Sequence, residues 1–165
     1  MKIWSRILCI SVLAGVISAC TTSSTPVASD TTEPTAAPTA ALSSVERSAI
    51  DLINAQRSQN GRSTLAISPN LVRAAQLHAA DMTQNAYFSH TGLNGSNVKT
   101  RVNAQGFKGC YWAENIASGR ETAEGVVQAW IDSDAHRKNI LTGSANQIGV
   151  GTSNGVWVAV FARAC

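Results

Sequence analysis

Two segments of the chain carry apolar residues at the spacing of an amphipathic helix. The first, SSVERSAIDLINAQRSQNG, begins at Ser43, where Ser43 and Glu46 have the spacing of a capping box, and it stops at Gly61. The second, SPNLVRAAQLHAADMTQN, has Ser68 as its expected N-cap and Pro69 at the first helical position. One face of this second helix is predicted to be buried, and it carries Leu71, Ala75, His78 and Met82.

The pattern changes in the second half of the chain. A loop, AYFSHTGLNGSN, leads to a short helical stretch at 98–104 that stops at Gly106, and the following GCYWAENIASG has too few periodic positions to assign. Another helix is predicted from Glu121, and its end, WIDSDAHRKNIL, breaks into a short polar stretch. The final residues form two β-rich runs about Asn154-Gly155, a dipeptide typical of a type I′ hairpin turn. Helices first, strands late and no repeated strand–helix alternation indicate an α+β layered domain.

The N-terminal segment differs in composition from the rest. Residues 1–19 combine Lys2 and Arg6 with an apolar run that is short for a bilayer span, which predicts an export signal peptide. Its end, ISAC, resembles the bacterial lipobox, so Cys20 is the predicted lipidated residue, carrying acyl chains such as palmitate. An ordinary signal peptide with a coincidental cysteine is the alternative. Several acyl chains on one residue would anchor the protein stably to a bacterial membrane, and Thr21 after the cysteine is compatible with the outer membrane.

Residues 20–41, after the signal peptide, are rich in Thr, Ser, Pro and Ala and lack apolar periodicity. Such a segment buries too little surface to offset the entropy of ordering, so we predict a disordered tether followed by one folded domain at 42–165. The charge of the whole chain is modest, with 13 Lys and Arg against 10 Asp and Glu. No Lys/Arg run or RNA-binding aromatic motif is present, so we expect no nucleic-acid partner.

Two cysteines, Cys110 and Cys165, remain in the predicted domain once the signal and the lipidated residue are set aside. In an oxidising extracytoplasmic compartment they are expected to form a disulfide between the middle and the end of the domain. Such a bridge would contribute ~3–4 kcal/mol by the loop-entropy relation. Two buried free thiols are the alternative.

Candidate chemistry concentrates in four polar residues. The chain has no HExxH motif, no CxxC pair, no GxSxG elbow and no Walker loop. His78 shares a helical face with apolar residues and is interpreted as a core histidine, whereas His90 and His136 are predicted at a loop or helix end, where function concentrates. Glu114 follows Tyr111 and Trp112, and a buried carboxylate would need partners because burying it unpaired costs several kcal/mol. The two imidazoles are the candidate partners.

Five ordered strings point to a family: FSH, AENIASG, VVQAWIDS, DAHRKNIL and IGVG. Together they resemble the CAP superfamily (cysteine-rich secretory, antigen 5, pathogenesis-related; also called the SCP domain), in particular its bacterial secreted branch. The resemblance runs from about Ser43 to Cys165. It implies a three-layer α-β-α sandwich with a central, mainly antiparallel sheet, and a solvent-filled cleft that carries two histidines and two acidic residues.

Three of these four cleft residues have counterparts here. By the resemblance, the first histidine maps onto His90, the glutamate onto Glu114 and the second histidine onto His136. Ala113 and Ala135 stand where the family usually has glycine.

The fourth cleft position departs from the family pattern. It falls on Ser133, with Asp132 and Asp134 beside it. Side chains one residue apart on a helix point about 100° apart, so neither aspartate is assigned as the replacement.

The set His90, Glu114 and His136 has three interpretations. It could bind Zn²⁺ with an open coordination position, as in metal-assisted hydrolases. It could act as a metal-free acid/base pair, although no nucleophile accompanies it. It could be a structural hydrogen-bond network that holds three distant segments together.

Three functions follow from these interpretations. The first is a membrane-anchored extracytoplasmic binding protein that presents its cleft to a cell-envelope polymer, a lipid or a protein. The second is a zinc-dependent hydrolase that uses the same cleft. The third is a domain whose cleft is purely architectural and whose recognition lies on the loops around 93–98.

Overall fold

The computed structural model describes residues 41–165, all of which lie in one compact unit. The predicted signal peptide at 1–19 and Cys20 lie outside the described residues, as does nearly all of the predicted tether. Within residues 41–165, no helix combines the length and apolar composition that crossing a membrane requires.

Helices and strands alternate irregularly along the chain. In order, the elements are α1 (Ser44–Gln59), β1 (Ala66–Ile67), α2 (Pro69–Gln84), α3 (Val98–Ala104), β2 (Gly109–Ala117), α4 (Ala123–Asp132), α5 (Asp134–Ile140), β3 (Gln147–Ser153) and β4 (Val156–Ala164). The strands form a single described sheet in the order β1-β3-β4-β2. Only the β1–β3 pair is parallel in this sheet, and the other two pairs are antiparallel.

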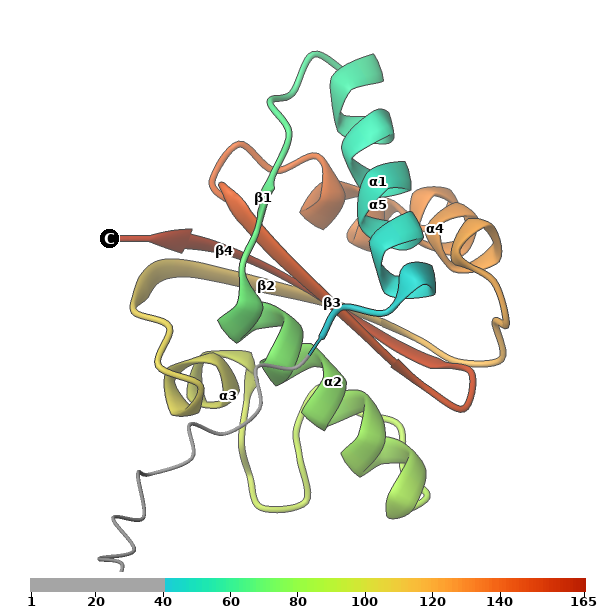
Figure 1. The fold of residues 1–165 in the computed structure, drawn as a ribbon, viewed down its shortest axis with the longest axis vertical. Helices are drawn as coiled ribbons and strands as arrows, with labels where there is room; N and C mark the ends of the chain where they lie inside the picture. The colour runs from blue at the N-terminus through green and yellow to red at the C-terminus, as the bar shows by residue number, and fades with distance from the viewer. Residues whose placement is uncertain (1–40) are drawn as a thin grey trace, which may run out of the picture. The chain divides into compact units, whose positions relative to one another are not determined.

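The sheet is buried on both faces. Figure 1 shows its strands running between two groups of helices, α1 with α4 and α5, and α2 with α3. Alternate residues of β4 face opposite ways: Trp157 and Phe161 pack in the core beside α1 and α4, and Val158 and Val160 pack in the core beside α2. This alternation produces the expected α-β-α sandwich, with one apolar core on each side of the sheet.

Two glycines of β3 allow α2 to lie directly against the sheet. A Cβ atom at Gly149 would fall 2.1 Å from the backbone carbonyl carbon of Leu71, and one at Gly151 would fall 2.2 Å from the backbone nitrogen of Gln76. Any side chain at these positions would force the helix outwards. The string IGVG therefore has a packing explanation in this chain.

The predicted start of α1 is confirmed. The Ser43 side chain accepts a hydrogen bond from the Glu46 backbone, and the Glu46 side chain accepts one from the Ser43 backbone. The predicted start of α2 is also confirmed, with Ser68 at the N-cap and Pro69 in the first turn, although the Ser68 side chain makes no capping hydrogen bond in the described chain. The Ser68 backbone N–H donates to the carbonyl oxygen of Ile148, because Ser68 directly follows the short strand β1, which periodicity did not reveal.

Two further segments differ from the sequence expectation. GCYWAENIASG, which was left unassigned, contains β2, and this strand pairs with β4 along its length. The polar stretch after Trp130 is a second helix, α5, because Ser133 has extended backbone angles and separates it from α4. The predicted hairpin turn is confirmed, with positive φ at both Asn154 (44°) and Gly155 (75°).

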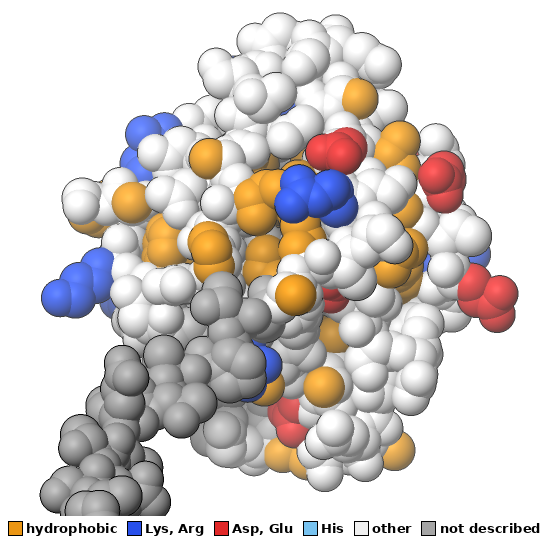
Figure 2. Space-filling view, in the orientation of Figure 1, with side chains coloured by type: hydrophobic (Ala, Val, Ile, Leu, Met, Phe, Trp, Pro, Cys, Tyr) orange, Lys and Arg blue, Asp and Glu red, His pale blue; other side chains and the backbone are white. Residues whose placement is uncertain are grey.

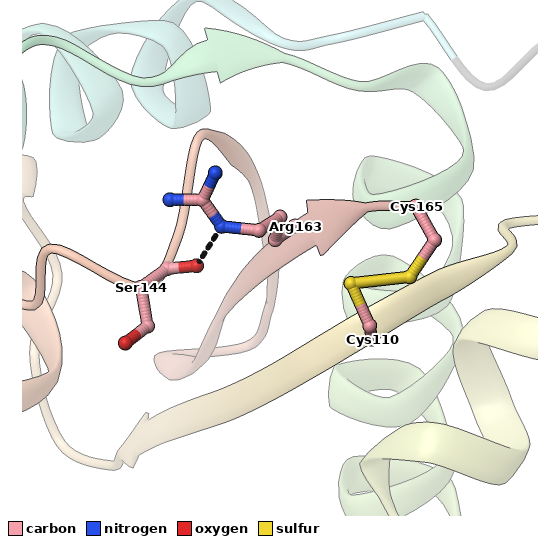
Figure 3. Close-up of a disulfide and its surroundings, with 4 residues drawn as sticks. All are labelled: Cys110, Ser144, Arg163 and Cys165. Atoms are coloured by element: carbon pink, nitrogen blue, oxygen red, sulfur yellow. Dashed lines mark hydrogen bonds between the residues drawn. A yellow bond between two sulfur atoms is a disulfide. The ribbon is translucent and has the colours of Figure 1, made fainter.

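The predicted disulfide between Cys110 and Cys165 is present, with a Cα–Cα distance of 5.7 Å. It joins the start of β2 to the end of β4, which are neighbouring antiparallel strands (Figure 3). The adjacent Arg163 donates hydrogen bonds to the carbonyl oxygens of Ser144 at 2.7 Å and Gly143 at 2.9 Å. Both contacts fasten the C-terminal strand to the rest of the domain.

Charged side chains of both signs are interspersed on the face seen in Figure 2. Apolar side chains on that face lie between them in small groups. The view shows no large region of a single sign, in keeping with the small excess of Lys and Arg over Asp and Glu in the sequence.

Candidate functional site: a buried carboxylate between an imidazole and a guanidinium

Glu114 is the centre of the site. It lies on β2 opposite Val160, and only 3% of its side chain is exposed. One carboxylate oxygen, Oε1, is 2.8 Å from His90 Nδ1, and the other, Oε2, accepts a hydrogen bond from Arg101 at 2.7 Å. Both oxygens of the buried anion therefore have strong partners, as the cost of burying a lone carboxylate requires.

Arg101 is the partner that sequence reasoning missed. Its side chain is 11% exposed, and besides Glu114 it donates to the backbone carbonyl of Ser96 at 2.9 Å. It thereby ties α3 and the preceding loop to β2. One feature of the sequence could have identified it. The Glu114 carboxylate was expected to be buried and therefore to need a cation, and Arg101 lies on the short helix predicted just before it in the chain.

His90 occupies the exposed end of this arrangement. It lies in the loop after α2, and 56% of its side chain is exposed. Its Nδ1 faces Glu114, and the other ring nitrogen is not used by that contact. The site therefore has a buried part, the Glu114–Arg101 ion pair, and an exposed part, the His90 imidazole.

His136 joins the site from α5. Its backbone carbonyl accepts a hydrogen bond from the Asn115 side chain at 3.1 Å. The Asn139 side chain in turn donates to the Asn115 side chain at 2.9 Å and to the Glu114 backbone carbonyl at 3.3 Å. These amides dock α5 onto β2 next to the carboxylate, and Asn139 is a second residue that sequence reasoning missed.

The two cleft histidines influence each other electrostatically. Burial lowers the pKa of His136 below its ordinary value of 6.5, and the charge of nearby His90 lowers that pKa further. The neutral form of His136 is thus favoured near neutral pH. The structure brings His90 and Glu114 into direct contact and places His136 close enough to His90 for their charges to interact.

His78 is a core residue, as predicted. It is 1% exposed, and its Nε2 donates to the backbone carbonyl of Ser89 at 3.0 Å. Burial, and then the charge of Arg101, lower the pKa of His78, so it is neutral at neutral pH. Because Ser89 immediately precedes His90, this bond helps to position the exposed imidazole.

The sequence profile of the cysteine-rich secretory protein (CAP) family matches residues 50–161, which is more than half of the chain. The chain belongs to the CAP family. The matched residues span most of α1, all of the elements from β1 to β3 and most of β4, and they include His90, Glu114 and His136.

Two proteins of Bacillus subtilis (strain 168) are related to this chain. The chain is 33% identical over 143 residues to the Bacillus subtilis (strain 168) protein YkwD, covering 86% of this chain and 56% of that protein. It is 28% identical over 118 residues to the membrane protein YlbC of the same strain, covering 72% of this chain and 34% of that protein. The chain therefore spans about half, or less, of the length of these two relatives.

Solved structures share the fold. An extracellular protein containing a SCP domain from Bacillus anthracis superposes with a TM-score of 0.70 at 29% identity, covering 72% of this chain and 40% of that chain. An outer surface protein from Borrelia burgdorferi superposes with a TM-score of 0.63 at 24% identity, covering 70% of this chain and 90% of that chain. The second likeness supports the CAP fold alone.

The fourth position of the family's cleft is not filled by a neighbouring aspartate in the described CAP domain. Asp132 accepts a hydrogen bond from Gln128, one turn back on α4, at 2.8 Å. Asp134 pairs with Arg137 on α5. Ser133 itself forms the junction between these two helices. Each aspartate is thus engaged on its own helix rather than with Glu114.

The zinc interpretation meets a specific difficulty in this CAP domain. Among residues 41–165, no group of three or more His, Cys, Asp or Glu side chains is arranged as a metal-binding set. Arg101 also places a cation against Glu114, the residue that would supply the anionic ligand. The described residues do not fit a zinc set in this arrangement, and zinc binding stays a prediction for metal analysis.

A separate hollow of about 500 Å³ lies between α2, α3 and the loop that joins them. We call it the α2–α3 hollow. Arg101 and His78 border it, whereas His90, Glu114 and His136 are not among its described lining residues. Arg101 therefore stands between the carboxylate site and this second concavity.

Proposed function

We propose that the chain is an extracytoplasmic binding protein, anchored to a bacterial membrane through lipid on Cys20, whose His90/Glu114/His136 cleft binds a cell-envelope polymer, a lipid or a protein. One sequence prediction and one comparison support the extracytoplasmic placement. The sequence begins with a predicted export signal, and the related Bacillus anthracis structure is an extracellular protein with a SCP domain.

The observation that carries the binding role is the double engagement of Glu114. A general base must be free to take a proton, but both oxygens of this carboxylate are held, one by His90 and one by Arg101. Such a carboxylate acts better as an organiser of the site than as a catalyst. It orients the exposed imidazole of His90, which offers a ligand a hydrogen bond at a fixed position.

Binding is tested with the full chain in detergent, incubated separately with isolated cell-wall polymer, vesicles of envelope lipids and solubilised envelope proteins. The wild type should be retained by one of these materials, and His90→Ala should weaken the retention. The matched control is Thr91→Ala, an exposed neighbour, which should behave like the wild type. Equal retention of His90→Ala and wild type, or no retention by any material, would refute a role of the cleft in binding.

The architectural interpretation gives a different outcome. In that case Glu114→Gln and His136→Ala would leave retention intact and lower only the melting temperature. The hydrolase alternative is examined by zinc analysis of the full chain. Stoichiometric zinc in the wild type that disappears in His136→Ala would favour it, and its absence from both proteins would remove it.

The lipid anchor is tested by membrane fractionation and by labelling cells with radioactive palmitate. The Cys20→Ala variant should lose the label and leave the membrane fraction. Cys9→Ala is the matched control, because Cys9 lies within the apolar run of the predicted signal peptide. Persistence of Cys20→Ala in the membrane fraction would contradict the anchor.

A further inference from the structure

The α2–α3 hollow has the dimensions of a ligand site. Its volume of about 500 Å³ lies within the range of roughly 300–1,000 Å³ that is usual for small-molecule pockets. Its walls are formed by the two helices α2 and α3 and by the loop between them. The hollow is separate from the cleft discussed above, and neither the family match nor the proposed function assigns it a role.

The walls of the hollow combine apolar and neutral polar groups. Leu77 and Leu93 line the hollow, and 41% and 69% of their surfaces are exposed, which is unusual for large apolar residues. Amide and hydroxyl side chains supply half of the remaining lining residues: Asn85, Asn94, Ser96, Thr100 and Gln105. A ligand there meets apolar surface and hydrogen-bonding groups together.

The two charged residues of the lining already have partners. Asp81 accepts hydrogen bonds from the side chains of Asn85 and Tyr87. Arg101 is paired with the buried Glu114. The charge of Arg101 is matched by Glu114, and the Asp81 carboxylate already accepts hydrogen bonds from two neutral side chains. The hollow therefore offers no unpaired cation to an anionic ligand, and we take the ligand to be neutral.

His78 supplies the most specific feature. It borders the hollow and is 1% exposed, and its Nε2 carries the proton donated to Ser89. Its Nδ1 is therefore an acceptor, yet it has no hydrogen-bond partner among the described residues. A buried acceptor without a donor costs about 1–3 kcal/mol. Nδ1 is closed off from solvent in this conformation, so a ligand hydroxyl or amide N–H would recover that cost when the side chains over Nδ1 move aside.

We propose that the α2–α3 hollow binds a neutral ligand that carries hydroxyl and amide groups on a partly apolar frame, of the class of N-acetylated amino sugars. The ring carbons of such a sugar would lie against Leu77 and Leu93. Its hydroxyl and amide groups would pair with the polar walls, and one of its donors would satisfy His78 Nδ1 once the wall opens over that nitrogen.

The test is isothermal titration calorimetry on the full chain in a detergent without sugar headgroups. The probe is N,N′-diacetylchitobiose, and octanoate, titrated against a micelle-only blank, represents a charged apolar ligand. Saturable one-to-one binding of the disaccharide and none of octanoate is the expected result. Binding of octanoate instead, or no saturable heat with the disaccharide, would overturn the proposal.

Matched variants locate the site. Ala104→Trp places an indole at the edge of the hollow and should abolish disaccharide binding. Asn103→Trp adds the same ring one residue earlier on α3, at an exposed position outside the lining, and should keep wild-type affinity. Equal binding by both variants would refute this location. Circular-dichroism melting verifies that both are folded.

His78→Phe examines the acceptor directly. It retains an aromatic ring and removes the nitrogen, so the dissociation constant should rise about tenfold or more, the factor that corresponds to 1.4 kcal/mol. An unchanged dissociation constant in the folded variant would contradict the role given to Nδ1. If His78→Phe does not fold, the Ala104→Trp and Asn103→Trp pair decides the proposal.

Discussion

Removing the guanidinium of Arg101 should destabilise the protein strongly. In Arg101→Met the buried carboxylate of Glu114 keeps His90 but loses its permanent cation. Breaking a buried ion pair on one side costs about 3–5 kcal/mol, because the remaining charge stays desolvated. Arg101 is 11% exposed and one partner of Glu114 remains, so we expect the lower end, about 3 kcal/mol.

The measurement is urea unfolding followed by circular dichroism, with the free energy of unfolding compared between variants. The matched control is Asp134→Asn, which breaks the Arg137–Asp134 pair, whose side chains are 42% and 92% exposed. An exposed pair contributes about 0–1 kcal/mol, so this variant should hardly differ from the wild type. A similar loss in Arg101→Met and Asp134→Asn would refute the argument that burial makes the Glu114 pair strong.

A double-mutant cycle separates the pair from its surroundings. Glu114→Gln alone should cost about 1–3 kcal/mol, because an amide cannot replace the carboxylate as an acceptor on both sides. Combined with Arg101→Met it should cost less than the sum of the two single changes, since the uncompensated charge is gone. Strictly additive losses would show that the two side chains do not depend on each other.

Three other properties are open to measurement. Gly149→Ala should lower the melting temperature through a loss of about 1–3 kcal/mol, because its Cβ would strike the α2 backbone. Gly143→Ala should be within about 0.5 kcal/mol of wild type, because its Cβ would make only an ordinary contact with the Arg62 side chain at 3.6 Å. Replacing Cys110 and Cys165 by serine together should cost about 4 kcal/mol by the loop-entropy relation for a separation of 55 residues, and an unchanged melting curve would contradict this. The free energy of unfolding should fall as the pH drops below 6.5, because the unfolded chain binds a proton at His78 that the folded chain excludes. Urea unfolding at about pH 7.5 and about pH 5.5 should show a smaller difference in His78→Phe, and an equal difference would refute the assignment.

The sequence predicted correctly those elements whose stabilising interactions join residues close together in the chain. The start of α1 depends on a capping box, and α2 depends on apolar spacing and on Pro69 in its first turn. The 154–155 turn depends on positive φ. All of these features act within a few residues. The strand β2 was missed because its stability comes from β4, about 45 residues later, and because its two faces do not alternate clearly in polarity. Local pattern alone cannot reveal such a strand.

The amino-acid sequence by itself supplied a candidate set of residues and a physical demand on one of them. Motif order marked His90, Glu114 and His136 as one set, and the polarity of Glu114 required that it find partners. Only the tertiary structure decided that the main partner is Arg101 and that Asn139 fastens α5 to β2. The physical reason is that a buried charge is stable only beside an opposite charge or hydrogen-bond donors. Which side chain lies near enough to pair with it depends on how elements distant in the sequence pack together.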